Sequence, residues 1–108
     1  PAGLWLTWSS ANGLIAIVSL SPGVVGGNEV HITVTPPGGS ITPIASVAAR
    51  VSLPSAAVPN APVTLVKEGV NHYSGSVTFP RSGDWTLEVV IQVTATETAL
   101  LSTTVPIP

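Results

Sequence analysis

The chain has 108 residues, no cysteine, a formal net charge of −2 and 7% charged residues, against roughly 25% in ordinary soluble domains. This length fits one domain, which can bury roughly two thirds of its unfolded surface and fold without a metal or a disulfide. Three basic residues cannot neutralise a run of phosphates, so the composition excludes nucleic acid as a partner. An apolar content of 44% argues against disorder.

Residues 1–11 precede the first clear strand pattern. The sequence begins at Pro1 without a basic and apolar leader, and no stretch reaches the 18 or more apolar residues of a membrane-spanning helix. We therefore expect a fragment of a longer protein. Residues 1–11 are predicted to be a linker or an additional edge strand, and residues 12–108 are predicted to be the folded domain.

Short runs rich in valine, isoleucine, threonine and leucine follow, separated by most of the eleven prolines and ten glycines. Such runs at close spacing are typical of all-β sandwiches. The turn-forming residues between them favour short connections. The predicted fold class is all-β, an immunoglobulin-like β-sandwich of about seven antiparallel strands. In chain order we predict strands at 13–20, 28–35, 44–53, 62–68, 71–79, 84–94 and 99–106.

The last long hairpin of this prediction contains the only tyrosine, the only phenylalanine and one of the three tryptophans. Alternation places Tyr73 and Phe79 on one face of the strand at 71–79, and it makes Trp85 the first of an inward ladder in the strand at 84–94. Burying Phe79 or Trp85 would contribute about 2–3 kcal/mol each. We interpret this cluster as the hairpin that organises the core.

Two of the predicted strands are apolar on both faces. In the first strand Ile15 and Ile17 lie on the face opposite to that of Leu14, Ala16, Val18 and Leu20, and in the last strand Leu100 lies opposite Leu101 and Val105. One hypothesis is that a neighbouring domain, a membrane-embedded partner or a second copy of the chain covers these outer faces. The alternative is an ordinary surface of low polarity. Trp5 and Trp8 would either pack on the edge of the sandwich or contact a partner or membrane headgroups, where tryptophan is favoured.

Residues for catalysis are scarce. The chain has two histidines and one aspartate, and it lacks a Gly-x-Ser-x-Gly nucleophile motif and a phosphate-binding glycine loop. His72 and Ser74 share a strand face, but the strand rise separates them by about 7 Å, too far for a direct base–nucleophile hydrogen bond. We predict that the protein is not an enzyme.

The histidines raise the question of a metal site. Alternation turns His31 and His72 outward on different strands, and the two would converge if those strands were neighbours. Two imidazoles with Glu29 or Asp84 would suit Cu(II) or Zn. Two solvated surface histidines are the alternative. Without cysteine or methionine, the chain cannot build a blue-copper centre or a thioether Cu(I) site.

The hairpin also resembles a known family. Its pattern is similar to the final hairpin of YtkA-like domains, small extracytoplasmic immunoglobulin-like sandwiches of bacteria, at Tyr73, Gly75, Val77, Phe79-Pro80, Gly83 and Trp85-Thr86-Leu87. The earlier stretch "GLIAIVSLSPGVVGGNEVHITVTPPGG" and the closing "TTVPI" resemble the same family, so the resemblance covers about residues 12–107.

The resemblance implies a context for the domain. YtkA-like domains often follow the membrane segments of copper-resistance proteins that fuse CopC-like and CopD-like parts. The resemblance supplies no copper ligands, because the CopC-type site needs an N-terminal histidine and Pro1 stands at that end here. The sequence identifies no certain cofactor, and copper is the candidate that the resemblance adds weight to.

The function expected from these observations is that of a non-catalytic extracytoplasmic accessory domain of a membrane copper transport or resistance protein. It would be tethered in the periplasm or at the cell surface and act by docking or support. Its partners would be membrane-embedded or neighbouring domains of the parent protein, or a second copy through the apolar strand faces. The alternatives are a Cu(II)-binding metallochaperone domain that uses His31 and His72, and a structural or adhesive immunoglobulin-like module of a bacterial surface protein.

Overall fold

The computed structural model describes the backbone of residues 5–11, 13–36, 43–56 and 58–108, and the side chains from residue 13 onward except 37–42 and 57–60. Across these residues it is an all-β structure, apart from a turn of 3-10 helix at Pro54–Ala56. In chain order the strands are β1 (Trp5–Ala11), β2 (Leu14–Ser21), β3 (Gly26–Thr35), β4 (Ser46–Leu53), β5 (Val58–Gly69), β6 (His72–Phe79), β7 (Gly83–Gln92) and β8 (Thr98–Ile107).

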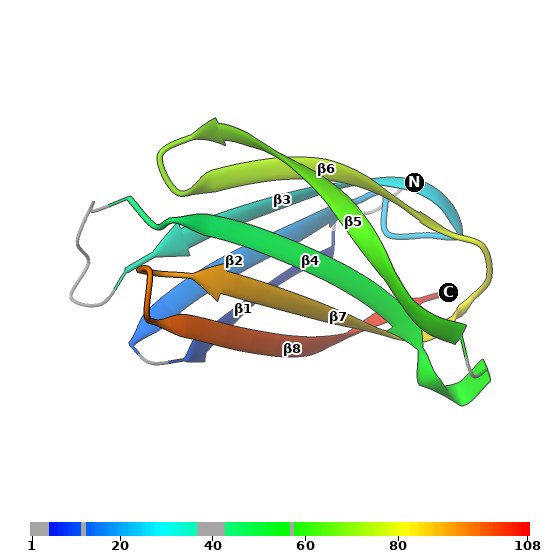
Figure 1. Cartoon of the computed structure of the whole chain (residues 1–108). Coiled ribbons are helices and arrows are strands. Elements are labelled where there is room, and N and C mark those ends of the chain that lie inside the picture. Colours follow the sequence, from blue (N-terminus) through cyan, green and yellow to red (C-terminus); the bar gives the residue numbers. More distant parts are fainter. Residues whose placement is uncertain (1–4, 12, 37–42, 57) are drawn as a thin grey trace.

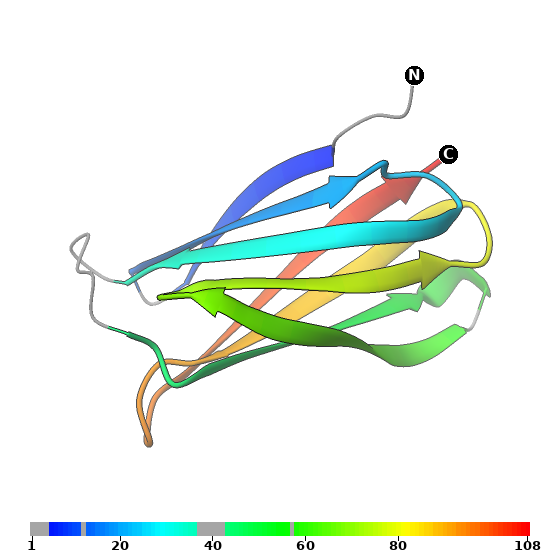
Figure 2. The same ribbon diagram turned by 90° about the horizontal axis from the view of Figure 1, so that it is seen from above.

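The strands form two stacked layers that share one long strand (Figures 1 and 2). The hydrogen-bonded order is β1-β2-β3-β6-β5-β4-β7-β8, and every pairing is antiparallel. The first half of β5 pairs with β4, whereas its second half pairs with β6, so β5 passes from one layer to the other. Because β1 and β8 also lie in contact, the strand order nearly closes on itself.

This order confirms the predicted immunoglobulin-like arrangement. If β2, β3, β6 and β5 are read as strands A, B, E and D, they form one sheet, and β4, β7 and β8 take the places of C, F and G in the other. The seven predicted strands are all present with ends shifted by a few residues. Residues Trp5–Ala11 add an eighth strand next to β2. The side chains of Trp5 and Trp8 lie outside the part of the chain that is described.

The side chains that alternation placed on the inner face of the hairpin are buried in the core. Trp85 is 2% exposed and Phe79 is fully buried, and their rings meet edge to face with centroids 5.3 Å apart. Tyr73 is buried on the same face of β6. The rest of the inward ladder of β7 is also buried as far as Ile91. The hairpin is therefore the centre of the core.

Two buried asparagines form hydrogen bonds that fix the loops of the first layer. Asn28 closes the β2–β3 loop, because its amide oxygen accepts a hydrogen bond from Gly23 N at 2.6 Å and its amide nitrogen donates to Val24 O at 2.8 Å. Asn71, in the left-handed conformation with φ 57°, is the last residue of the turn into β6. Its side-chain oxygen accepts a hydrogen bond from Ile44 N at 2.8 Å, just before β4, and so ties the two layers together.

Within the described residues, nothing forms a helix with the length and apolarity that crossing a bilayer demands.

Candidate functional site

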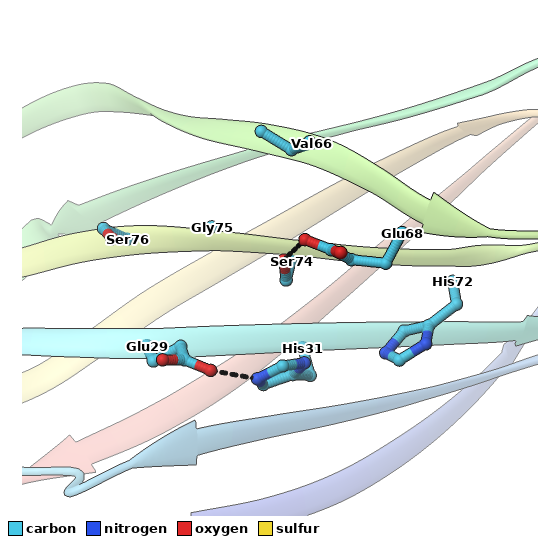
Figure 3. A pocket seen from close by; sticks show the side chains of 8 residues that line it. All are labelled: Glu29, His31, Val66, Glu68, His72, Ser74, Gly75 and Ser76. Carbon is cyan, nitrogen blue, oxygen red and sulfur yellow. Dashed lines mark hydrogen bonds and ion pairs between the residues drawn. The ribbon is translucent and has the colours of Figure 1, made fainter.

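A shallow hollow of about 460 Å³ lies on the outer face of the first layer, over β3, β6 and the second half of β5 (Figure 3). It contains both histidines of the chain and two of its carboxylates. We call it the histidine hollow. The residues that line it are Glu29, His31, Val66, Glu68, His72, Ser74, Gly75 and Ser76.

Strand register brings the two histidines together. β3 and β6 are neighbours, with His31 opposite Ser74 and Thr33 opposite His72, so the two histidines are diagonal neighbours on one face. Their ring centroids are 5.7 Å apart and the rings are inclined at 43°. The expectation that the histidines converge if their strands are adjacent is therefore met by the geometry.

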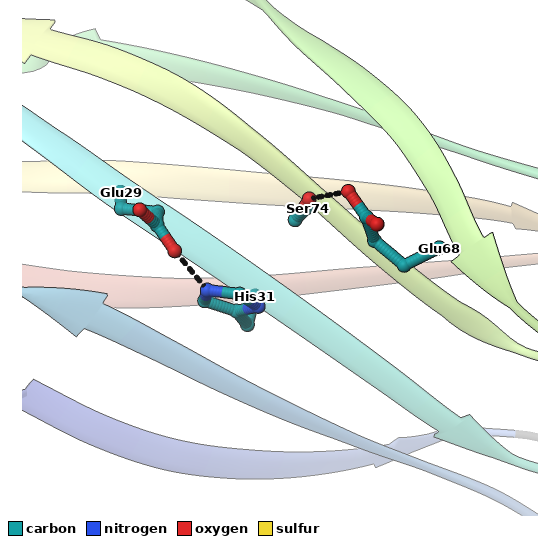
Figure 4. Close-up of polar contacts among 4 residues, drawn as sticks. All are labelled: Glu29, His31, Glu68 and Ser74. Carbon is teal, nitrogen blue, oxygen red and sulfur yellow. Dashed lines mark hydrogen bonds and ion pairs between the residues drawn. The ribbon is translucent and has the colours of Figure 1, made fainter.

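Each of the two carboxylates contacts a neighbour within the hollow (Figure 4). Glu29 Oε1 is in contact with Nε2 of His31, two residues along the same strand. Ser74 Oγ donates a hydrogen bond of 2.5 Å to Glu68 Oε1 across the β5–β6 pair. No lysine or arginine lines the hollow, so the charge of its two carboxylates favours a cation.

A close backbone approach builds one wall of the hollow. A Cβ atom added at Gly75 would lie 2.0 Å from the main-chain oxygen of Thr64. Only glycine therefore fits on β6 where β5 crosses beside it. The crossing places Glu68 and Val66 above β6 (Figure 3).

The structure corrects one proposed ligand and adds another carboxylate. Asp84 lies on β7 in the second layer, paired with Pro106 of β8, so it does not line the hollow. Residue spacing alone could not separate Asp84 from Glu29, because it does not say which strands are neighbours. Sequence reasoning missed Glu68, although the short turn from Gly69 makes β5 and β6 neighbours and two-residue alternation puts Glu68 on the face of Val66.

As they stand, the side chains do not surround a single point. Among the residues that the structure describes, no group of three or more histidine, aspartate or glutamate side chains is arranged to hold a metal ion. The hollow thus contains two neighbouring imidazole rings and two carboxylates. One carboxylate, of Glu29, contacts His31, and the other, of Glu68, accepts a hydrogen bond from Ser74.

The same outer face carries exposed apolar side chains. Ile15 and Ile17 on β2 are 41% and 42% exposed, and Val66 at the hollow is 59% exposed. Ile17 lies opposite Thr33, which lies opposite His72, so the apolar pair is on β2, the strand directly beside the β3 edge of the hollow. The structure thus shows which of the two apolar faces of this strand is the outer one.

The outer face of the second layer differs. There Arg50 of β4 lies directly opposite Glu88 of β7 and donates two hydrogen bonds to its carboxylate, at 3.2 and 3.0 Å. These bonds hold the pKa of Glu88 below its usual range and raise the pKa of Arg50. Leu100 on β8 is exposed on this side. Among the side chains described on this layer, the paired charges and the one exposed large apolar residue suit a solvated face.

Comparison with known proteins supports the fold and leaves the function open. No protein-family model matches the chain, and no curated protein is significantly similar to it in sequence. A DUF4785 family protein from Legionella pneumophila, known from a crystal structure, is similar in fold, with a TM-score of 0.65 and 17% sequence identity. The match covers 89% of this chain, and the chain spans 28% of the length of that protein.

Proposed function

We propose that the chain is a non-catalytic accessory domain that docks on a neighbouring part of a larger protein. The observation that carries this proposal is the pair of exposed isoleucines, Ile15 and Ile17, next to each other on the outer face of β2. Apolar side chains that recur on one outer face mark a surface for contact with another protein surface. The low content of charged residues points in the same direction, because charged side chains are depleted at the centre of interfaces.

The occupant of this surface is a neighbouring domain of the same parent protein. In support, the DUF4785 protein that shares the fold is more than three times as long as the matched segment, so an equivalent sandwich there is one part of a larger chain. Contacts between domains of one chain are commonly modest in area and partly polar, as a face with two isoleucines among threonines and serines would provide.

The resemblance to YtkA-like domains supplies the wider setting of the proposal. In that setting the parent is a membrane protein of copper transport or resistance, and this domain lies outside the cytoplasmic membrane. The full-length coding sequence tests the setting directly. We expect spanning segments upstream of the domain, whereas tandem sandwiches would favour the structural or adhesive module instead.

Docking has a separate test. The domain and the remainder of its parent are produced as two chains, and their co-purification is measured for wild type and for the double variant Ile15→Thr/Ile17→Thr. We expect the double variant to fold and to lose most of the association. Leu100→Thr, which removes an exposed apolar side chain from the other layer, is the matched control and should bind like wild type. Equal loss in both variants, or in neither, would contradict docking through β2.

A further inference from the structure

The two histidines lie at a distance that one metal ion can span. A metal–imidazole bond of roughly 2.0–2.1 Å puts a ring centroid about 3 Å from the ion, so two rings on one ion have centroids about 5–6 Å apart. The rings of His31 and His72 have centroids 5.7 Å apart. In Figure 3 they approach each other across the strand pair from β3 and β6. Metal binding would require rotation of these two partly exposed side chains, so that one nitrogen of each ring is directed at a common point.

The carboxylate of Glu29 fixes which nitrogen of His31 is available. A carboxylate accepts hydrogen bonds, so in the neutral imidazole its contact with Nε2 favours the tautomer that has the proton there and the lone pair on Nδ1. This carboxylate–histidine pairing is the arrangement that orients metal-binding imidazoles and makes them better ligands. Glu29 is therefore a positioning residue for His31 rather than an unrelated neighbour.

Charge and access also suit a bound cation. Both carboxylates of the histidine hollow lie on the outer face of the first layer. The side chain of Glu29 is 65% exposed and that of His31 is 39% exposed, so an ion in solvent can reach them. An ion held by two imidazoles has positions left for water or for an outside ligand. The hollow would thus hold an exchangeable ion rather than a closed structural one.

The ligand chemistry selects the metal. Imidazole with carboxylate suits Cu(II), Zn and Ni, whereas Mg and Ca prefer all-oxygen sites. Among divalent first-row transition metals, the affinity for such a site is generally highest for Cu(II), followed by Ni(II) and Zn(II). From these observations we infer that His31 and His72, with Glu29 orienting His31, form a surface site for one divalent transition-metal ion, with Cu(II) bound most tightly. This site does not depend on the proposed docking through β2.

Titration of the 108-residue chain with CuCl2, and separately with ZnCl2, tests the inference. We expect one Cu(II) per chain, an affinity at least tenfold weaker in His31→Ala or His72→Ala, and no specific binding in the double variant. Electron paramagnetic resonance of the Cu(II) form should show two imidazole nitrogens in wild type and one in each single variant. Glu29→Gln should weaken binding roughly tenfold or more while both nitrogens remain bound.

Asp84→Asn is the matched control, because it removes a surface carboxylate from the other layer. It should bind Cu(II) like wild type. All variants are expected to keep the wild-type melting temperature without metal, since both histidines lie on the outer face. Wild-type affinity in the double histidine variant, or a wild-type spectrum with a single nitrogen ligand, would overturn the site. Loss of docking in the isoleucine variant would leave this result unaffected.

Discussion

The indole nitrogen of Trp85 donates a hydrogen bond of 2.9 Å to the main-chain oxygen of Arg81, four residues earlier in the chain. The bond ties the polar edge of an otherwise buried ring to the Pro-Arg-Ser-Gly turn that separates β6 from β7. The ring itself packs edge to face on Phe79. A single side chain thus closes the turn and fills the space between the two layers, which explains why scarce aromatic residues gather at this hairpin.

Trp85→Ala should remove about 3–5 kcal/mol of stability, which is much of the margin of a small domain, and leave the chain largely unfolded at 37 °C. Trp85→Phe keeps most of the buried ring and loses the hydrogen bond, so we expect a smaller loss of about 1–2 kcal/mol. Urea unfolding followed by circular dichroism gives both values. A Trp85→Ala protein with the wild-type transition would mean that the ring does not organise the core.

Gly75→Ala should destabilise the domain by about 3 kcal/mol or more, because the new methyl group would meet the main-chain oxygen of Thr64, which cannot move without shifting β5. Gly27→Ala on the adjacent strand β3 is the matched control, since a Cβ there has no atom within 4 Å. That control should be neutral or more stable by up to about 1 kcal/mol. Similar unfolding midpoints for the two variants would contradict the close approach of β5 to β6.

Asn71 combines a left-handed backbone with a buried hydrogen bond to Ile44 N, and two substitutions separate these contributions. Asn71→Gly keeps the backbone conformation and loses the side-chain acceptor, which should cost about 1–3 kcal/mol. Asn71→Ala loses the acceptor and also strains the backbone, so it should be less stable than Asn71→Gly by about 1 kcal/mol. Thermal unfolding ranks the two variants, and the reverse order would show that the conformation at residue 71 is not left-handed.

The Arg50–Glu88 pair should make a pH-dependent contribution to stability. Because the folded protein lowers the pKa of Glu88, the contribution is fully present above the unfolded pKa of about 4.3 and is lost as pH falls through the lower folded pKa. A double-mutant cycle with Arg50→Ala and Glu88→Ala, measured by urea unfolding at pH 6 and at pH 3, isolates the pair. We expect a favourable coupling energy at pH 6 that decreases at pH 3, and an unchanged coupling energy would contradict the ion pair.

Much of the fold could be predicted from local pattern. Alternation assigned Trp85 and Phe79 to the core correctly, because the side-chain period of a strand is fixed at two whatever its neighbours are. The passage of β5 between layers was not predictable in this way. It depends on a change of pairing partner near Val63 and Thr64, and nothing in the local pattern marks where a strand leaves one neighbour for another.

The candidate site shows the same division. The outward direction of His31 and His72 followed from alternation, and their proximity required the pairing of β3 with β6, which are separated in the chain by two other strands. The choice of Glu29 rather than Asp84 as the carboxylate near the histidines required knowing which strands form which layer. Long-range pairing is a property of the whole chain, so the sequence pattern supplied the candidate ligands and the topology selected among them.

Because β5 is hydrogen-bonded to β4 along one half and to β6 along the other, neither layer can separate without breaking bonds in the shared strand. The two layers should therefore unfold as one cooperative unit. In native-state hydrogen exchange, the central amides of β6 and β7 would open with the same free energy and the same denaturant dependence. A lower opening free energy confined to one layer would mean that the shared strand does not couple them.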